Sequence, residues 1–368
     1  MKLYTVLYYT IILTQPRAFA YQDSTTIAAS KLYHTRSVTR RIFIGQNYRS
    51  TWSLGIKMPI FDIKTVNGGM VIVKMGGQQT KSLYMRDKDS INWVLRSVDK
   101  SFDKAMPGFV KKTVIKKYYQ DMVSASYPYG ALIVAALAKA LGIYAPDPRL
   151  FYIPDDEAFG KYRKVFAHTV CMLEKVEPGF DNTPTEITDT VLKRIQTSRQ
   201  YRIDDTSYLK IRLLDMLVAD WDRHKDQLRW GVRGYNTDTV YYPIPRDRDQ
   251  AFYYSDGISI KVIHTFGTKY MAGFTGSTGK VRQLNYKSWD LDKILLKNLD
   301  EKDWQRIILA FQQMMSDDAL LSAVNALPVE ARQQDAEMIF KKLKSRRDKL
   351  PKDAIKYHAF LLKRKAVG

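Results

Sequence analysis

The amino-acid sequence predicts an α+β protein of two lobes, a small antiparallel β-rich N-terminal lobe and a larger α-rich C-terminal lobe. Two observations carry this prediction. Short segments that alternate between apolar and polar residues, the pattern of half-buried strands, follow one another closely between residues 70 and 98. Patterns with the 3.6-residue period of helices dominate from residue 207 onward. The chain has 368 residues, of which 45% are hydrophobic, and this suffices for a large buried core.

The N-terminal lobe is expected to begin with three antiparallel strands. They are predicted at 70–75 (MVIVKM), 82–86 (SLYMR) and 92–98 (NWVLRSV). The glycine pair Gly76 and Gly77 lies in the first turn, where glycine tolerates backbone conformations that other residues avoid. These strands would form one sheet.

A helical region follows, and the chain then returns to strands. The segment VIKKYYQDMVSAS is expected to be helical, and a second helix is expected from Pro128 to a stop at Gly142. Strands are predicted at 148–154 and 165–176. The single cysteine, Cys171, lies in the second of these strands and is expected to be a packed core thiol, since it has no partner for an intramolecular disulfide.

The C-terminal half is expected to be mostly helical. A short strand (VYYPIP) is predicted at 240–245. Helices are predicted at 207–220, 300–315, 316–327 and 335–350. The chain therefore divides into a basic lead-in (21–50), an N-terminal lobe (51–176) and a C-terminal lobe (177–368).

Residues 1–20 have the order of a secretory signal peptide. Lys2 precedes a short, mostly apolar run, and AFA, a small–x–small cleavage pattern, ends at Ala20. A buried strand or helix start is the alternative. The signal predicts a protein that is secreted across the inner membrane and is periplasmic or associated with the outer membrane.

The strong positive charge predicts an anionic partner. The formal net charge is +21, and residues 341–368 hold eleven lysines and arginines against two aspartates. Phosphorylated substrates, anionic lipid and nucleic acid are all compatible with such a charge. No nucleic-acid reader motif occurs, and a secretory signal argues against nucleic acid. The basic C-terminal run is more commonly the solvated face of an amphipathic helix.

Several kinds of site are unsupported because their sequence motifs are absent or incomplete. The sequence has no His-Glu-x-x-His and no Cys-x-x-Cys, so a zinc site is unsupported. GFTGSTGKV (273–281) resembles a Walker phosphate loop, but Phe274 stands where the first glycine belongs and Val281 where serine or threonine belongs. The segment DRDQAFYYSDG lacks the glycine and ligand positions of an EF-hand.

Two short acidic segments are the strongest candidates for chemistry. DWDRHKDQ (220–227) follows the predicted helix 207–220, and PRDRDQAF follows the predicted strand 240–245. A carboxylate after a helix, here Asp222, can orient or deprotonate a hydroxyl group. A carboxylate after a neighbouring strand, here Asp247, can hold magnesium on phosphates. A solvated charged loop is the alternative interpretation.

Basic residues in the predicted sheet are candidates for binding phosphate. Lys81 lies on the first hairpin, and Arg96 and Lys100 lie at the end of the third strand. Any of them could neutralise the α- or β-phosphate of a nucleotide. The turn GGQQTKS could approach a polyphosphate with its backbone amides.

The two acidic segments resemble the catalytic and metal-binding segments of atypical kinases. DMLVADWDRHKDQ followed by PIPRDRDQAF is similar to segments of the phosphatidylinositol 3- and 4-kinases, the secretory-pathway casein kinases and the spore-coat protein H kinases. The span from YRSTWS to KLKSRRDKL resembles most closely the kinase-like region of large Bacteroidetes envelope proteins that also carry a metallophosphatase domain and an outer-membrane barrel. The resemblance implies a bilobal protein-kinase-like fold.

The resemblance also implies roles for individual residues. Asp222 would be the catalytic aspartate, and Asp121 would lie on the helix whose acid pairs with the basic residue of the third strand, here Arg96 or Lys100. The metal ligands would be Asp247, Gln227 and Asp249. The nucleotide-binding residues would be those of the hairpin and the hinge, namely Gly76, Gly77, Gln78, Thr80, Lys81, Leu173, Glu174 and Lys175. Arg96 stands where kinases have lysine, and Gln227 where they have asparagine.

The function expected from this resemblance is phosphoryl transfer from ATP, with Mg²⁺ or Mn²⁺, to a hydroxyl group of an unidentified acceptor. Its partners would be a nucleotide and the hydroxyl substrate. The alternative is a catalytically silent kinase-like module that binds envelope proteins or an anionic membrane surface, because Arg96 and Gln227 depart from the kinase pattern.

Overall fold

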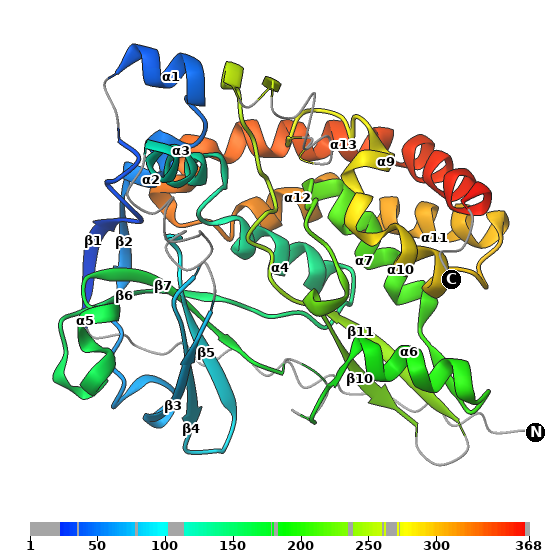
Figure 1. Ribbon diagram of the computed structural model, residues 1–368, viewed down its shortest axis with the longest axis horizontal. Helices are drawn as coiled ribbons and strands as arrows, with labels where there is room; N and C mark the ends of the chain where they lie inside the picture. The colour runs from blue at the N-terminus through cyan, green and yellow to red at the C-terminus, as the bar shows by residue number, and fades with distance from the viewer. Residues whose placement is uncertain are drawn as a thin grey trace, which may run out of the picture.

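The protein has an α+β architecture in which a β-rich lobe and a larger α-rich lobe lie side by side (Figure 1). The computed structural model describes residues 23–34, 37–77, 80–101, 114–177, 179, 183–234, 238–259, 261–262, 271 and 273–364. Within these residues the arrangement agrees with the fold class that the sequence predicts.

A five-stranded antiparallel sheet forms the β-rich lobe. Its order is β3-β4-β5-β7-β6. The strands are β3 (Met70–Gly76), β4 (Ser82–Asp87), β5 (Asn92–Ser97), β7 (Thr169–Lys175) and β6 (Arg149–Ile153). The three strands predicted first are confirmed. One side of the sheet packs into a hydrophobic cluster that includes Leu83, Leu95 and Cys171, so the thiol is a core group as expected.

The strand predicted at 165–176 begins later than expected. A 3₁₀ segment (Glu157–Tyr162) and the short helix α5 (Arg163–Phe166) come first, and β7 begins only at Thr169. His168 between them has a positive φ of 58°, which turns the chain out of the helix and into the strand. The apolar run at 165–176 therefore contains the end of a helix, a turn and a strand, and not a single strand.

The lead-in is structured, which the weak periodicity of residues 21–50 did not predict. It contains β1 (Ser24–Ala28), α1 (Val38–Ile44) and the start of α2 (Arg49–Ser53). β1 pairs with β2 (Gly55–Pro59) in a two-stranded antiparallel sheet. Ser37 caps α1 by accepting a hydrogen bond from the Arg40 amide.

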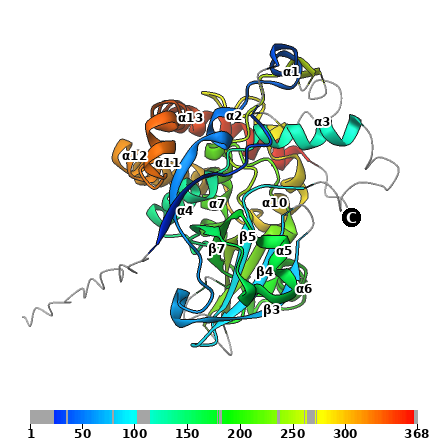
Figure 2. The same ribbon diagram turned by 90° about the vertical axis from the view of Figure 1, so that its left-hand side faces the viewer.

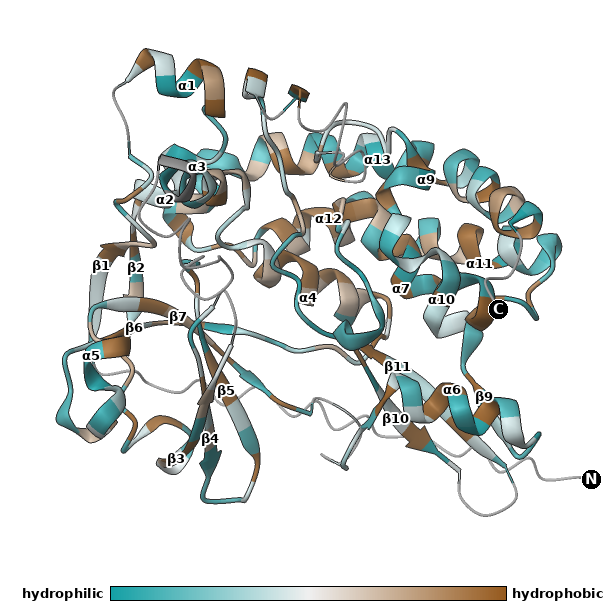
Figure 3. Cartoon of the chain, viewed as in Figure 1, coloured by the Kyte–Doolittle hydropathy of each residue, from teal (hydrophilic) through white to brown (hydrophobic). Residues whose placement is uncertain are grey.

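Helices pack around a large hydrophobic cluster in the second lobe. They are α4 (Gly130–Ala140), α7 (Asp205–Val218), α9 (Val281–Leu284), α10 (Trp289–Leu295), α11 (Glu301–Met314), α12 (Asp317–Val324) and α13 (Val329–Lys363). Figure 2 shows α11, α12 and α13 side by side, and α13 contacts both α11 and α12. Helix α4 is coloured as hydrophobic along most of its length, as expected for a helix at the centre of a core (Figure 3).

A second sheet in this lobe carries the two acidic segments. Its order is β8-β10-β11-β9. The strands are β8 (Glu186–Ile187), β9 (Tyr201–Ile203), β10 (Leu228–Arg233) and β11 (Thr239–Pro245), and α6 (Thr188–Thr197) lies between β8 and β9 in the chain. Only β11 was predicted. DWDRHKDQ connects α7 to β10, and PRDRDQAF follows β11, so the antiparallel pairing of β10 and β11 brings the two segments together.

One described segment, Lys117–Ala140, is long and apolar enough to cross a membrane, and 72% of its most apolar window is buried inside the protein. It comprises the end of α3 (Val114–Met122), a 3₁₀ turn and α4. Core helices commonly have this composition, so the segment is weak evidence for a membrane span.

Candidate functional site

The DWDRHKDQ segment begins where α7 ends. The last turn is closed at Ala219, whose amide donates to the Asp215 carbonyl and whose positive φ of 57° lets the Asp220 amide donate to the same carbonyl at 2.9 Å. The chain then turns through Asp222 and enters a 3₁₀ turn at Lys225–Gln227 before β10. The left-handed cap thus redirects the chain from the helix into the acidic segment.

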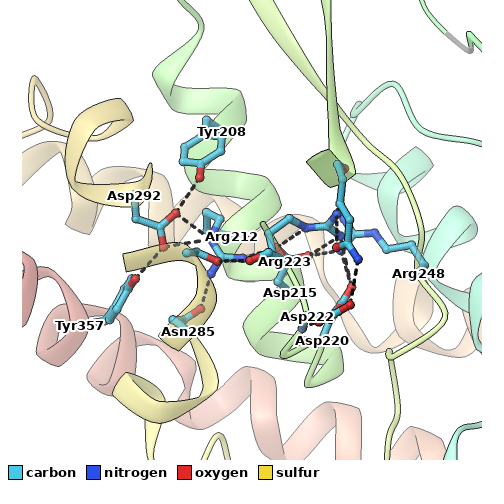
Figure 4. A network of polar contacts seen from close by, with 12 residues as sticks. Tyr208, Arg212, Asp215, Asp220, Asp222, Arg223, Arg248, Asn285, Asp292 and Tyr357 are labelled. Atoms are coloured by element: carbon cyan, nitrogen blue, oxygen red, sulfur yellow. Dashed lines mark hydrogen bonds and ion pairs between the residues drawn. The ribbon is translucent and has the colours of Figure 1, made fainter. Parts of the chain in front are cut away.

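A buried network of arginines and aspartates supports this segment from below (Figure 4). Asp215 of α7 accepts hydrogen bonds from Arg212, Arg223 and Arg248. Asp220 accepts from Arg223 and Arg248 at 3.2 Å each. All five side chains are buried, and buried ions are stable only when they are paired in this way.

The network continues beneath α10. Asp292 accepts hydrogen bonds from Tyr208, Arg212 and Tyr357 at 2.6–3.1 Å. Arg212 also donates to the side chain of Asn285. The floor of the site is therefore built from α7, α10 and α13, which are far apart in the sequence.

Arg223 joins the two acidic segments. Its Nη1 atom donates to the Gln227 carbonyl at 3.0 Å and to the Arg246 carbonyl at 2.8 Å. The Arg246 amide in turn donates to the Gln227 carbonyl at 2.8 Å. Because Arg246 directly precedes Asp247, these contacts hold the second acidic segment against the first.

Asp222 lies at the surface of this assembly. Its Oδ2 atom accepts a hydrogen bond from the Gln227 amide at 3.1 Å, and its Oδ1 atom forms an ion pair with Lys287. The carboxylate is 21% exposed, so it is held in place and still reachable from solvent. Such a group can accept a proton from a bound hydroxyl.

The second acidic segment takes an unusual backbone path after β11. Asp247 has a positive φ of 55° and Phe252 one of 63°. Phe252 is fully buried, donates its amide to the Val218 carbonyl and packs on Phe274 with ring centroids 4.8 Å apart. This anchoring holds Asp247 in a conformation that costs free energy, a feature that recurs at functional sites.

A pocket between the two lobes brings together six of the predicted site residues, Thr80, Arg96, Lys100, Glu174, Asp247 and Asp249. They come from the five-stranded sheet and from the segment after β11. The rest of its wall is formed by Trp52, Ser97, Val98, Ser126, Tyr127, Pro128, Ala131, Met172 and Arg248. The wall thus combines apolar surface with convergent charges, as is common in ligand pockets.

Ion pairs link these charges across neighbouring elements. Arg96 of β5 pairs with Glu174 of β7 at 3.0 Å. Lys100 is buried and pairs with Asp249 at 2.7 Å. Burial opposes the charge of Arg96, but Glu174 and Asp247 outweigh it and raise its pKa. Arg96 therefore carries positive charge in the pocket, beside the ion pair of Lys100 with Asp249.

The predicted hinge is only partly in the pocket, because strand side chains alternate between the two faces of a sheet. Met172 and Glu174 of β7 line the pocket, whereas Leu173 is fully buried in the sheet's hydrophobic cluster. The ammonium of Lys175 lies over the Trp93 ring, 5.8 Å from its centroid. Leu173 and Lys175 therefore face away from the pocket.

The first hairpin is also only partly in the pocket. Thr80 lines it, but the ammonium of Lys81 donates to the Val165 carbonyl at 2.8 Å. Gly76 ends β3, and Gly77 has a φ of 94° in a turn so tight that a side chain there would meet the Thr80 carbonyl. Gln78 lies outside the described residues.

Asp121 of helix α3 has different partners from the basic strand residues that were expected. Asp121 of α3 is buried and accepts hydrogen bonds from Arg40 of α1 and Arg49 of α2 at 2.6–2.9 Å. Among the described residues it has no ion pair with Arg96 or Lys100. The expected strand–helix ion pair is therefore absent, since two arginines of the N-terminal region take its place.

Two carboxylates of the site bind a proton more tightly than a free aspartate does. The neighbouring charge of Asp249, with a smaller contribution from desolvation, raises the pKa of Asp247 to about 6, and the residue is exposed to solvent. Burial likewise raises the pKa of Asp220 to about 6, although Arg223 opposes this shift. Crowding of negative charge at Asp247 is relieved by a cation, because opposite charges favour the ionised carboxylate.

The residues present fit a hard divalent cation. Within the described residues the Asp247 carboxylate has neither a hydrogen bond nor an ion pair, whereas Asp249 is committed to Lys100. The Asp247 carboxylate is the kind of oxygen donor that suits Mg²⁺ or Mn²⁺. The side-chain oxygen of Gln227 instead accepts a hydrogen bond from Arg223 at 3.3 Å, and Gln227 does not line the pocket. The described part of the chain contains no cluster of three or more His, Cys, Asp or Glu arranged around a metal position. A metal here would depend on phosphate oxygens and water for its remaining ligands.

Several residues of the site were not foreseen from the sequence. Met172 could have been predicted, because side chains alternate along a strand and Met172 lies on the same face of β7 as Glu174. Lys287 and Arg248 reach the site through tertiary contacts with residues 65 and 28 positions away in the chain. Asp215 occupies an ordinary position within helix α7. No local pattern identifies such residues.

No family model matches the chain, and no curated protein sequence matches it. The solved structures that are similar include two kinases. The proinflammatory kinase CtkA of Helicobacter pylori is 12% identical with a TM-score of 0.40, over 75% of this chain and 94% of that one. The Golgi casein kinase is 13% identical with a TM-score of 0.40, over 94% of this chain and 86% of that one. Similarity this low assigns the chain to no family.

Proposed function

We propose that this chain is a secreted kinase-like phosphotransferase that moves the γ-phosphoryl group of ATP to a hydroxyl group, with Mg²⁺ or Mn²⁺ as cofactor. The observation that carries the proposal is the junction at Arg223. One buried guanidinium joins the loops of Asp222 and Asp247, beside a pocket that also contains Arg96 and Lys100. A proton acceptor, a metal ligand and two phosphate-neutralising cations are the parts that phosphoryl transfer requires.

The proposed reaction is a direct displacement at phosphorus. The acceptor oxygen forms a bond to the γ-phosphorus while the bond from that phosphorus to the β–γ bridging oxygen breaks, and its electron pair leaves with ADP. The hydroxyl proton passes to the carboxylate of Asp222, which Gln227 holds in place at 3.1 Å.

The basic residues of the pocket would stabilise the charge of the phosphates. Arg96 and Lys100 lie in the wall that faces Asp247, and each is now paired with a carboxylate that a phosphate oxygen can replace. Asp247 would hold the divalent cation, which neutralises phosphate charge when bound, and Gln227 would join it only once its side-chain oxygen is released from Arg223.

Substitution of the two key aspartates tests this proposal. In Asp222→Asn and in Asp247→Asn, phosphoryl transfer from ATP, measured as autophosphorylation and as phosphate release with MnCl₂ or MgCl₂, should fall by about 10²-fold or more. Asp226→Asn is the matched control, because Asp226 lies in the same segment and is 76% exposed. Wild-type turnover in both variants, with all three proteins folded, would reject the assignment.

A catalytically silent module that binds nucleotide weakly or not at all is the second candidate. It is favoured by one observation, the capture of Asp121 by Arg40 and Arg49, because active protein kinases pair the acid of this helix with the strand lysine. Metal-dependent binding of a fluorescent ATP analogue with a Kd below the millimolar range supports the enzyme. No such binding supports the module, with an envelope protein or anionic membrane surface as its partner.

The proposal includes secretion, on the signal-like residues 1–20, and a cell-envelope setting, on the resemblance to the kinase-like region of Bacteroidetes envelope proteins. The amino-terminal sequence of the exported protein tests it. A mature chain that begins near Tyr21 agrees with cleavage after Ala20, and retention of residues 1–20 contradicts it.

A further inference from the structure

Lys287 faces Asp222 from outside the pocket. It belongs to a 3₁₀ turn (Tyr286–Ser288) between α9 and α10, 65 residues after Asp222 in the chain. Its ammonium forms an ion pair with Oδ1 of Asp222 and lies over the Trp221 ring, 5.0 Å from the centroid. Lys287 is therefore fixed in direction by a carboxylate and by an aromatic face.

Two buried contacts hold the turn that carries Lys287. The hydroxyl of Ser288 donates to the Arg223 carbonyl at 2.7 Å, which ties the turn to the DWDRHKDQ segment. Asn285 accepts a hydrogen bond from Arg212 and donates to the Val281 carbonyl at 2.8 Å. Both side chains are 1% exposed. The position of Lys287 beside Asp222 is thus set by the same network that supports the acidic segments.

Lys287 lies apart from the residues that face a nucleotide. It does not line the interlobe pocket, whose cations are Arg96, Lys100 and Arg248. Its side chain is 34% exposed, so the ion pair of Lys287 with Asp222 is open to solvent. If the pocket binds the nucleotide, a cation in this place would lie on the acceptor side of Asp222.

We infer that Lys287 is a positioning residue of the transfer reaction, which holds the Asp222 carboxylate toward the acceptor and offsets its charge as the phosphoryl group arrives. This inference rests on the proposed function. The carboxylate and the phosphoryl oxygens are both negative, so their approach is repulsive unless a cation lies beside them. With Gln227 on Oδ2 and Lys287 on Oδ1, each oxygen keeps one lone pair for the acceptor proton.

A split between turnover and nucleotide affinity tests the inference. In Lys287→Met the kcat for phosphate release from ATP with MnCl₂ should fall by about 10²-fold, while KM for ATP and the Kd of a fluorescent ATP analogue stay within about twofold of wild type. Lys287→Arg, which keeps the charge, should recover about tenfold of that loss. Lys225→Met is the matched control, because Lys225 lies in the acidic segment, is half exposed and pairs with Asp189 instead.

The outcomes separate the inference from the proposed function. An unchanged kcat in Lys287→Met, beside an active wild-type protein, overturns the inference alone. The inference is also overturned if kcat falls in Lys287→Met, is not recovered in Lys287→Arg, and the melting temperature falls to a matching extent. In that case the lysine has only a structural role. A wild-type protein without metal-dependent transfer overturns the proposed function, and the inference with it.

Discussion

The aspartates of DWDRHKDQ have different environments although they occupy one short segment. Asp220 is 1% exposed and bonded to two arginines, Asp222 is 21% exposed, and Asp226 is 76% exposed. The sequence indicated Asp222 because the residue types after it match a kinase pattern. It did not distinguish Asp220 from Asp226, since the arginines that decide this, Arg223 and Arg248, lie in place only after folding.

Asp215 is the residue on which the network depends most, because it balances three guanidinium groups. Asp215→Asn keeps the shape of the side chain but removes its charge, and it leaves Arg212, Arg223 and Arg248 with too little negative charge in a buried site. The free energy of unfolding, measured with urea, should fall by about 3–5 kcal/mol.

The exposed Asp226 provides the comparison for this variant. Asp226→Asn should change the free energy of unfolding by less than about 0.5 kcal/mol. A loss of less than about 1 kcal/mol in Asp215→Asn would contradict the prediction, because a typical uncharged hydrogen bond accounts for as much.

At the scale of elements, the prediction found the clearly alternating strands and the long helices of the C-terminal half, but it missed the ten-residue helix α6 and elements whose partners lie elsewhere in the chain. The strands β3, β4 and β5 alternate clearly and were found, whereas the three-residue β9 is too short to show a period. The helix predicted at 335–350 stopped at Leu350, directly before Pro351. Helix α13 continues to Lys363 with Pro351 inside it.

The continuation of α13 has a specific cause. Pro351 leaves the Arg347 carbonyl without its helical donor, and the side chain of Gln312 from α11 donates to that carbonyl at 3.2 Å. A residue of the neighbouring helix thus replaces the missing bond. No signal within the α13 sequence reveals this, since the two residues are 35 positions apart.

A double-mutant cycle tests the role of Gln312. Gln312→Ala should lower the free energy of unfolding by about 1 kcal/mol, because the Arg347 carbonyl loses its donor. Pro351→Ala restores the helical amide, so Gln312→Ala should cost less in that background, with a coupling of about 0.5 kcal/mol or more. Equal costs in the two backgrounds, measured by urea unfolding, would mean that Gln312 acts independently of the proline.

At the scale of the whole molecule, some of the basic residues that suggested an external anionic partner form contacts within the protein instead. Arg346 of the basic C-terminal run is buried and donates to the carbonyls of Met216 and Leu217 at the end of α7. Lys344 and Arg347 both pair with Asp317 of α12. These residues support the helical lobe, which weakens the interpretation of the run as a membrane-binding surface.

The basic lead-in has a similar internal role. Arg40 and Arg49 reach Asp121, which lies 81 and 72 residues further along the chain. Residues 21–50 lack a regular period, so the sequence indicated a loose segment there. Its structure comes from the pairing of β1 with β2 and from the ion pair of Arg49 with Asp121, and neither partner is visible in a local pattern.

The two-lobed arrangement predicts that nucleotide binding and phosphoryl transfer depend on different residues. Arg96 lies in the β-rich lobe within the pocket, whereas Asp222 lies in the α-rich lobe outside the residues that line it. Arg96→Met should raise the Kd of a fluorescent ATP analogue with MnCl₂ by about tenfold or more, because a phosphate-facing cation is lost. Asp222→Asn should leave that Kd within about twofold of wild type while transfer is lost.

Glu174 decides how the Arg96 variant is interpreted. Arg96→Met leaves Glu174, which is 12% exposed, as an unpaired negative charge in the pocket, and that charge alone would repel ATP. The double variant Arg96→Met with Glu174→Gln removes this charge. If Arg96 contacts phosphate, the weak binding persists in the double variant. Full recovery of affinity there would show instead that Arg96 serves only to neutralise Glu174, and the phosphate contact would then fall to Lys100.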